Sequence, residues 1–336
     1  MSKSLTSLAK FAVLMALSLA CMFALSACQS AGDTGDAQQS GDKAQTQTSV
    51  NIGTLATEDF LPMWKAESDK LFEEAGLEVN ITKFNSAQEL SAALAAKAID
   101  GAMTDIPVAA TLSEGGTPMT VSWVTLGQEP NEGRFGIMVG PNSRITDVKE
   151  LASTPIGVGS GTMLEYVMDK LLLDAGLTQD QIQKEELKKL PVRLQMVMQG
   201  EVAAGIFPAS LLALGESQGA KVLVDDTSKD NLSQSIMAFR TEFAQSEEGK
   251  QAIEKLKGAW DSAVESINKD PEAQRELMLA NAKLPDSLKD SYPVPHYPKA
   301  QKPDQSLVQS VLDWMKEKAY ITSLTYDPES GKLKTA

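Results

Sequence analysis

The chain has 336 residues and a formal net charge of −14 at pH 7, and 42% of its residues are hydrophobic. This length is enough for two domains, or for one large domain with a sizeable core. The acidic balance repels phosphate backbones and anionic lipid head groups, so nucleic acid is excluded as the expected partner.

Residues 1–27 have the pattern of a bacterial lipoprotein signal peptide. Lys3 and Lys10 supply positive charge, and the apolar run after them is too short for a comfortable membrane span. The run ends in "LSAC", which resembles a lipobox and places Cys28 directly after the expected cleavage site. We therefore predict that Cys28 is lipidated and anchors the protein to the bacterial cell membrane. An ordinary secretory signal and an uncleaved N-terminal anchor are the alternatives.

The positions of the two cysteines exclude some kinds of site, and the segment after them predicts a tether. Cys21 and Cys28 lie at or before the expected cleavage site, so thiol catalysis and Cys-based metal sites are excluded for the mature chain. Residues 28–49 hold the cysteine and then a small and polar segment without a large apolar residue, which predicts a flexible tether. The folded part is expected to begin at about Val50.

Strands and helices alternate along the first half of the folded part. In chain order we expect a strand at 49–56, a helix at 62–77, a strand at 78–84, a helix opening at 85, a strand, turn and helix over 98–116, and a strand at 119–126. Pro62 suits a first helical turn and Gly76 a helix end, and Ser86 and Glu89 have the spacing of a capping box. This alternation predicts an α/β fold with mostly parallel sheets.

The second half repeats this order. We expect a strand at 154–161, a helix at 162–177, a weak strand near 186–191, a helix at 191–201, a strand at 202–207, a helix at 208–219 and a strand at 220–226. Thr162 and Glu165 again have capping-box spacing. We therefore predict two similar α/β lobes, with chance similarity between Ala-rich helices as the alternative. A last amphipathic helix over 306–322 is expected to dock on the first lobe through Leu307, Val311, Leu312 and Met315.

Several of these segments resemble one known family. The stretches "VNIGTL", "AALAAKAIDGAMTDIPVA", "FGIMVGPNSRITDVKELASTPIGVGSGTMLEYVMDKLL" and "GEVAAGIFPAS" are similar to those of the solute-binding lipoproteins of ABC importers for nitrate, taurine, aliphatic sulfonates and thiamine-type pyrimidines. The best-matching part has Ser143, Ile145 and Leu151 at the family's positions between two strands. The resemblance covers roughly residues 50–300.

The resemblance implies a type II periplasmic-binding-protein fold, in which two α/β lobes are joined by two hinge strands. Carried onto this chain, lobe 1 takes 50–127 and 236–336, lobe 2 takes 134–225, and the hinges are 128–133 and 226–235. The implied protein is extracytoplasmic and lipid-anchored, captures a small polar solute between the lobes, and delivers it to an ABC permease with its ATPase. It is expected to be a monomer without a cofactor or a metal.

The glycine-rich stretch "IGVGSGTM" follows an expected strand and opens an expected helix, where anions bind. A dinucleotide fingerprint would need glycine where Thr162 stands, and no Gly-Lys-Ser/Thr sequence follows for a nucleotide-phosphate loop. We interpret the stretch as a solute cradle, because ligands bind beyond the carboxyl ends of parallel strands. A turn that only packs the helix against the strand is the alternative. The expected cradle residues are Gly159, Ser160, Gly161 and Thr162.

The same rule places further candidates after other expected strands. The expected ligand-binding residues outside the cradle are Thr57, Glu58, Phe60, Asn85, Ser86, Thr104, Asp105 and Phe207. Asp105 has a helix N-cap as its alternative. Phe60 and Phe207 could stack on a flat ligand and have a core position as their alternative.

Acidic side chains dominate the expected cleft. They are Glu58, Asp59, Asp105 and Glu165, and the nearest candidate cations are Arg134 and Lys83. A nitrate or sulfonate site needs a cation or a dense set of donors, so the carboxylates favour a neutral or amine-bearing ring such as a thiamine-precursor pyrimidine. Alternatively, these acids begin helices and face the solvent, in which case they do not indicate the chemical class of the substrate.

An enzyme is not expected. The one histidine, His296, lies in a Pro-rich stretch, so the mature chain lacks the histidine and cysteine positions that Ser/His/Asp or Cys/His catalysis would need. His-rich metal sites are excluded for the same reason, whereas an all-carboxylate metal site is not. A membrane-anchored ligand sensor or interaction protein on the same scaffold is the main alternative function. A pyrimidine-synthesis-type enzyme is a remote one, because the His-rich and Cys-rich motif of such relatives is absent here.

Overall fold

The computed structural model describes residues 47–129, 132–228, 232–282, 284 and 288–335. The expected signal peptide, Cys28 and most of the expected tether lie outside the described residues. Residues 45–336 form one unit by their contacts, and the description below concerns that unit. Across the described ranges, no helix combines the length and the apolarity that crossing a bilayer would require.

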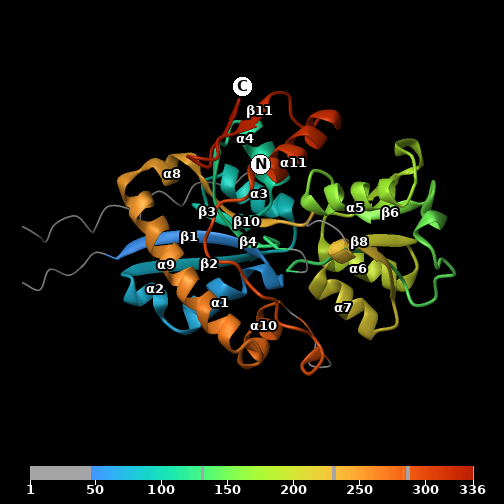
Figure 1. The fold of residues 1–336 in the computed structure, drawn as a ribbon, viewed down its shortest axis with the longest axis horizontal. Helices are drawn as coiled ribbons and strands as arrows, with labels where there is room; N and C mark the ends of the chain where they lie inside the picture. The colour runs from blue at the N-terminus through green and yellow to red at the C-terminus, as the bar shows by residue number, and fades with distance from the viewer. Residues whose placement is uncertain (1–46, 130–131, 229–231, 283, 285–287, 336) are drawn as a thin grey trace, which may run out of the picture. The chain divides into compact units, whose positions relative to one another are not determined.

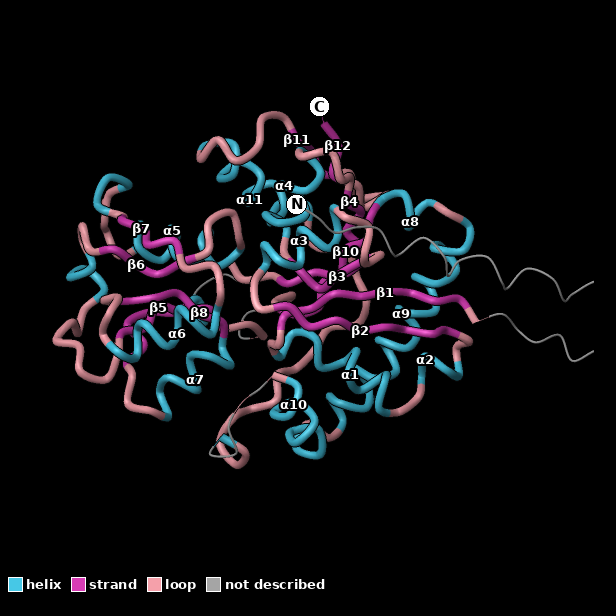
Figure 2. The backbone as a smooth tube through the Cα atoms, turned by 180° about the vertical axis from the view of Figure 1, so that it is seen from behind, coloured by secondary structure: helices cyan, strands magenta, loops and turns pink. Residues whose placement is uncertain are grey.

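The described residues form two five-stranded sheets and one two-stranded sheet. The first sheet has the order β2-β1-β3-β10-β4, in which β1 pairs in parallel with β2 and β3, and β10 is antiparallel to both of its neighbours (Figure 2). Its strands are β1 (Thr48–Leu55), β2 (Leu77–Phe84), β3 (Gly101–Thr104), β4 (Met119–Leu126) and β10 (Ser235–Arg240).

The second sheet repeats this pattern in the order β7-β6-β8-β5-β9, with β5 as the antiparallel strand. Its strands are β5 (Phe135–Val139), β6 (Pro155–Val158), β7 (Gln183–Glu186), β8 (Ala204–Pro208) and β9 (Lys221–Asp225). The chain passes from the first sheet to the second after β4 and returns after β9. The predicted α/β fold class is therefore confirmed.

Helices cover both faces of the first sheet. In Figures 1 and 2, α1, α2 and α9 lie on one side of β1 and β2, and α3, α4 and α11 lie on the other. The helices of this part are α1 (Leu61–Ser68), α2 (Leu71–Glu74), α3 (Ala87–Ala95), α4 (Ile106–Glu114), α8 (Thr241–Gln245), α9 (Glu247–Lys269), α10 (Arg275–Asn281) and α11 (Gln305–Glu317). A small hairpin of β11 (Leu324–Tyr326) and β12 (Leu333–Thr335) follows α11.

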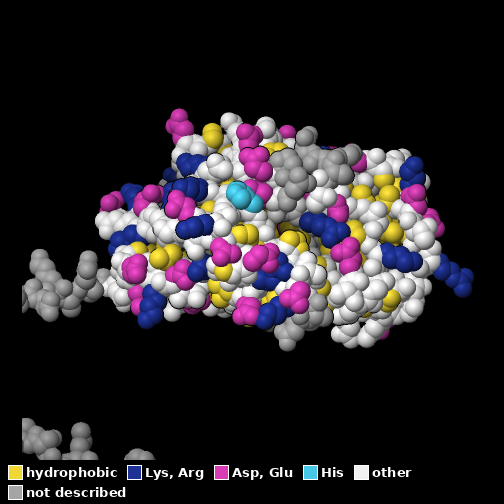
Figure 3. Space-filling view, turned by 60° about the horizontal axis from the view of Figure 1, so that its bottom comes forward, with side chains coloured by type: hydrophobic (Ala, Val, Ile, Leu, Met, Phe, Trp, Pro, Cys, Tyr) yellow, Lys and Arg dark blue, Asp and Glu magenta, His cyan; other side chains and the backbone are white. Residues whose placement is uncertain are grey.

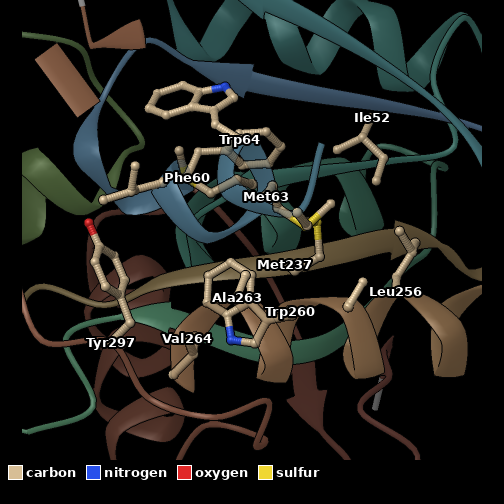
Figure 4. Close-up of a cluster of buried hydrophobic side chains, with 14 of the residues drawn as sticks. Ile52, Phe60, Met63, Trp64, Met237, Leu256, Trp260, Ala263, Val264 and Tyr297 are labelled. Carbon is tan, nitrogen blue, oxygen red and sulfur yellow. The ribbon is translucent and has the colours of Figure 1, made fainter. Parts of the chain in front are cut away.

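The two-residue period of the strands divides the core between these faces. Along β10, Met237 and Phe239 point into a cluster with Trp64 and Trp260, whereas the alternate residues point into a second cluster with α4 and α11. Figure 4 shows Met237 beside Trp260 and Ala263 in the first cluster. The strands β3, β10 and β4 are thus buried on both faces, as is typical of strands in parallel sheets.

The second sheet is covered by α5 (Met163–Asp174), α6 (Leu190–Gln199) and α7 (Ala209–Ser217). Alternation along β5 again divides the core, because Ile137 and Val139 pack with residues of α5, and Met138 packs with residues of α6 and α7. Along the chain, α5 follows β6, α6 follows β7 and α7 follows β8.

Three local predictions differ from the structure. The weak strand expected near 186–191 lies earlier in the chain, at β7 (Gln183–Glu186). The helix expected at 62–77 is broken after Ser68, because Lys70 adopts a left-handed φ of 61°. The capping box expected at Thr162 is not formed. The Thr162 hydroxyl donates to the Gly159 carbonyl at 2.8 Å, and Glu165 accepts from the Gly161 N–H at 2.6 Å.

The C-terminal helix α11 contacts both halves of the unit. It packs on α4, as expected, through Val311, Leu312 and Met315, but Val308 is in the cluster in place of the expected Leu307. It also contacts α5 of the second sheet, where the rings of Trp314 and Tyr166 have centroids 5.4 Å apart. The sequence did not indicate this second contact.

Candidate functional site

A cavity of about 340 Å³ lies where strands of both sheets end. The first sheet contributes the segments after β1 and β3, and the second contributes the glycine-rich turn after β6 and the start of α6. Carboxyl ends of parallel strands are where ligands bind in α/β folds. The cavity is lined by Leu55, Thr57, Asp59, Ala87, Gln88, Leu90, Ser91, Met103, Thr104, Asp105, Val108, Thr111, Phe135, Gly159, Ser160, Gly161, Thr162, Met163, Leu164, Lys188, Leu190, Arg193, Pro208, Ser235 and Tyr320.

The structure brings together most of the residues expected to bind a ligand. Those that line the cavity are Thr57, Thr104, Asp105, Gly159, Ser160, Gly161 and Thr162. Glu58 is buried behind the lining, Ser86 caps α3, and Asn85 is exposed beside it.

The two candidate aromatic residues lie in cores instead of in the lining. Phe60 is fully buried, and its ring packs edge-on against Trp64 with centroids 5.6 Å apart (Figure 4). Phe207 is fully buried beneath the guanidinium of Arg193. Both side chains therefore face the hydrophobic interior, which is the usual position for phenylalanine.

The donors of the glycine-rich turn already have partners within the chain. The Ser160 N–H and hydroxyl both donate to Glu186, and the Gly161 N–H donates to Glu165. The first N–H of α5, on Met163, donates to Asp105 Oδ2 at 2.9 Å. Three carboxylates thus occupy donors that a bound anion would use.

Glycine is favoured at different positions of this turn for different structural reasons. Gly161 has a φ of +73°, which strongly favours glycine. A Cβ on Gly157 would lie 3.2 Å from Cγ of Arg193, and one on Gly159 would lie 3.1 Å from its Nη2. The turn therefore lacks side chains where the guanidinium of Arg193 passes beneath it.

Asp105 joins the two sheets at the cavity. Its Oδ1 accepts from the Val108 N–H at 2.8 Å and caps α4, while its Oδ2 accepts from Met163 at the start of α5. The N-cap alternative from the sequence is therefore correct, and Asp105 caps a second helix as well. Burial raises the pKa of Asp105 to about 6, and the two backbone hydrogen bonds oppose that rise.

Glu58 and Asp59 form a buried acidic pair behind and beside the cavity. Glu58 accepts from the Ser210 N–H of α7 at 3.2 Å, and Asp59 accepts from the Ser235 hydroxyl. Burial, and then the charge of Asp59, raise the pKa of Glu58 to about 7. Burial also raises the pKa of Asp59.

These raised pKa values predict an unusual pH dependence of stability. The folded chain holds protons on Glu58, Asp59 and Asp105 more tightly than the unfolded chain does. The free energy of unfolding should therefore fall as the pH rises from about 5 to about 8. Urea unfolding at several pH values measures this slope.

The matched variant for this prediction is Glu58→Gln, which is close to the protonated acid in shape. It should flatten the pH slope and should be more stable than the native chain at pH 8, where the native Glu58 is ionised. An unchanged slope in this variant would show that Glu58 titrates normally.

The cations of the cavity are not those that the sequence suggested. Arg134 pairs with Asp225 at 2.7 Å and with Glu216 at 3.0 Å, outside the cavity. Lys83 donates to Asn281 and lies over the ring of Trp64. The cations that line the cavity are Lys188 and Arg193, neither of which was among the expected site residues. The spacing of Leu190, Arg193, Leu194 and Val197 nevertheless puts Arg193 on the apolar face of its helix.

The described lining of the cavity contains no histidine. Within the described ranges, no group of three or more His, Asp or Glu side chains could hold a metal ion. The His296 side chain is 69% exposed and lies 3.2 Å from Glu132. Figure 3 shows the histidine at the surface among scattered acidic and basic side chains.

Comparisons with known proteins agree with this fold. A model described as the NMT1-like family matches residues 43–278. Among curated proteins, no sequence match was found.

Three solved structures illustrate the structural likeness. The alkanesulfonate-binding protein SsuA of Xanthomonas axonopodis pv. citri, bound to MOPS, is 16% identical, with a TM-score of 0.70 over 82% of this chain and 95% of that one. The periplasmic aliphatic sulphonate-binding protein SsuA of Escherichia coli is 21% identical, with a TM-score of 0.66 over 82% and 94%. The ligand-binding component of an ABC-type import system of Staphylococcus aureus, with zinc bound, is 17% identical, with a TM-score of 0.71 over 84% and 96%. These likenesses confirm the periplasmic-binding-protein fold predicted from the sequence.

Proposed function

The chain belongs to the NMT1-like family, and on that premise we propose that it is an extracytoplasmic solute-binding lipoprotein of an ABC importer. It would capture a small polar solute in the cavity between its two sheets and deliver the solute to a permease with its ATPase. The observation that carries this proposal is the cavity of about 340 Å³, whose lining comes from strand ends of both sheets. A solute there would contact both halves of the unit at once.

The proposed mechanism is closure around the solute. Lobe 1 would be 50–127 with 236–336 and lobe 2 would be 134–225. The hinges would be 128–133 and 226–235, of which 130–131 and 229–231 lie outside the described residues. In the open form each lobe offers half of a site, and a solute that engages both halves shifts the population to the closed form. One ion pair between the two lobes supports this mechanism, since Lys189 of lobe 2 lies 2.9 Å from Glu89 of lobe 1.

The similar structures support a small solute as the ligand. Two of them are named as binding alkanesulfonates or aliphatic sulphonates, and the third is named as the ligand-binding component of an importer. The cavity has room for a small organic molecule rather than for a peptide or an oligosaccharide. The single histidine is at the surface, away from the cavity, which supports binding rather than catalysis.

Thermal and chemical unfolding of the mature chain with a panel of solutes tests the binding function. The panel holds nitrate, alkanesulfonates, taurine, thiamine-type pyrimidines, riboflavin and amino acids. A true ligand at one hundred times its dissociation constant should add about 2.7 kcal/mol to the free energy of unfolding. No stabilisation by the panel or by a deproteinised extract of small molecules would contradict a binding role.

The membrane anchor gives a separate prediction. Replacing Cys28 by serine should move the exported protein from the membrane fraction to the soluble extracytoplasmic fraction, because lipidation needs the thiol. Fractionation followed by immunoblotting measures this shift, and Ser26→Ala serves as a variant that keeps the cysteine. Membrane retention of the Cys28→Ser protein would contradict the lipid anchor.

A further inference from the structure

Glu58 joins lobe 1 to lobe 2 at a point that is closed to water. The residue is 1% exposed and lies between β1 and α1 of lobe 1. Its Oε1 accepts from the Ser210 N–H, at the start of α7 in lobe 2, at 3.2 Å. Its Oε2 has no hydrogen-bond partner among the described residues. Because a buried carboxylate with an unpartnered oxygen is poorly solvated, this contact is unfavourable when Glu58 is ionised.

Two cavities flank the contact between Glu58 and Ser210. Pro208 lines the cavity of about 340 Å³, and Ala209, the next residue, lines a second cavity of about 580 Å³. Tyr292 of lobe 1 also lines the second cavity. The start of α7 is therefore a partition between the two cavities. A movement of lobe 2 away from lobe 1 would part Ser210 from Glu58 and admit water to the carboxyl group.

The titratable groups nearest to Glu58 carry negative charge or none. Asp59, the next residue, is 5% exposed, and its charge raises the pKa of Glu58. Tyr292 and Tyr297 approach from the C-terminal segment. Burial raises the pKa of each of these tyrosines well above its usual value, so both stay neutral.

The other elements packed around the acidic pair bring no compensating cation. The strand β4 has no titratable side chain, and β10 contributes the Ser235 hydroxyl, which donates to Asp59. On α1, Lys65 is paired with Asp69 at 2.7 Å. Among the described residues, no lysine, arginine or histidine stabilises either carboxylate of the pair. Closure therefore buries negative charge that nothing nearby neutralises.

Asp105 joins the lobes in a different way. It accepts from the Met163 N–H of lobe 2 at 2.9 Å, and its other oxygen accepts from the Val108 N–H at 2.8 Å. Both of its oxygens are thus solvated by backbone donors, whereas Glu58 and Asp59 each keep one buried oxygen without a partner. The acidic pair is therefore the stronger candidate for taking up a proton on closure.

We propose that the Glu58–Asp59 pair takes up a proton when the two lobes close, so that acid favours the closed form and strengthens solute binding. This inference rests on the proposed solute-binding function and names a regulation of that site. In the open form water solvates both carboxylates, and in the closed form the proton removes the uncompensated charge. The proton belongs to the pair, because neighbouring carboxyl groups titrate together.

The direction of the effect follows from where each form holds the proton. With the lobes in contact, burial raises the pKa of Glu58 to about 7, from an ordinary value of 4.5. Between these two values the closed form carries the proton and the open form does not. The ratio of closed to open molecules should therefore rise about tenfold for each pH unit from about 7 down to about 5, and it should level off above about pH 7.

Energy transfer between dyes on the two lobes measures closure without a solute. Glu73→Cys on α2 and Glu201→Cys after α6 place the dyes at exposed positions of the mature chain, with Cys28→Ser to prevent a third label. Single-molecule recording from pH 8 to pH 5 should show the closed population growing. Glu58→Gln, neutral at every pH, should remove most of this dependence. Glu67→Gln, exposed on α1, is the matched control and should keep the parent profile.

Proton counting gives a second readout, on binding itself. Titration calorimetry at pH 6 uses an alkanesulfonate or another stabilising solute of the panel whose charge is constant from pH 5 to pH 8. Comparison of two buffers with different ionisation enthalpies should show an uptake of about one proton per solute bound. Glu58→Gln should lose most of this uptake, whereas Asp105→Asn should keep it.

The outcomes separate this inference from the proposed function. A closed population that is independent of pH, together with binding that takes up no proton, would overturn the inference and leave solute binding intact. Loss of the pH dependence in Asp105→Asn but not in Glu58→Gln would overturn it as well. If Glu58→Gln does not fold, the parent profile and Asp105→Asn still decide. Closure that depends on pH, without binding of any solute or extract, would overturn the proposed function instead.

Discussion

Replacing Asp169 by alanine is expected to lower the free energy of unfolding by about 3 kcal/mol. The Asp169 side chain is 1% exposed and lies 2.7 Å from Nζ of Lys318 and 3.3 Å from Nζ of Lys184. It also accepts from the indole N–H of Trp314 at 3.1 Å. The substitution would leave two partly buried ammonium groups and a buried indole N–H with fewer partners. Urea unfolding measures the loss.

The exposed acid Asp180 provides the matched control, because it lies just beyond the end of α5 and is exposed. Asp180→Ala should change stability by no more than about 0.5 kcal/mol. Asp169→Asn, which keeps an acceptor for Trp314 without the charge, should fall between the two. A loss below about 1 kcal/mol for Asp169→Ala would mean that the network contributes little to stability.

This network explains why α11 matters to the cavity. Asp169 is on α5, the helix that begins at the glycine-rich turn, and its partners Trp314 and Lys318 belong to the C-terminal segment. Tyr320 of the same segment donates to Glu165 at 2.8 Å and lines the cavity. The C-terminal segment therefore holds the start of α5 against the first sheet. We expect that Asp169→Ala also weakens solute binding.

The order of strands and helices could be predicted from the sequence because it depends on local patterns. The β-branched run of β1, the capping residue Ser86 and the proline of α4 each act within a few residues. The strand-end rule then placed Thr57, Thr104, Asp105 and the glycine-rich turn around one cavity. These predictions needed no knowledge of which residues meet across the fold.

The charges and aromatic residues of the site could not be predicted in the same way. Arg193 shares the apolar face of α6 with Leu194 and Val197, but its place beneath the glycine-rich turn depends on how the helix packs. Asp169 and Lys318 are paired from distant positions, so no local pattern connects them. Phe60 follows β1 and Phe207 lies near the end of β8, where ligand-binding residues are expected, but both rings face the core.

Trp260→Ala is expected to have the other large effect, a loss of about 3–5 kcal/mol. Trp260 is fully buried on α9, and its ring centroid is 5.9 Å from that of Trp123. Its indole N–H donates to the Pro298 carbonyl at 3.0 Å. Figure 4 shows Trp260 within the cluster under the first sheet. Removal of the ring leaves a cavity and an unpaired carbonyl, and urea unfolding measures both effects together.

The hydrogen bond from Trp260 to Pro298 connects the core to the proposed binding site. Pro298 follows Tyr297, whose hydroxyl donates to the Glu58 carbonyl at 2.8 Å directly beside Asp59. Trp260→Phe keeps most of the ring but loses the donor, so it should lose less stability than Trp260→Ala while still loosening the Tyr297 segment. We therefore expect Trp260→Phe to weaken solute binding, whereas Gln251→Ala on the exposed face of α9 should alter neither property. Unchanged solute affinity in Trp260→Phe would show that the segment keeps its position without the indole hydrogen bond.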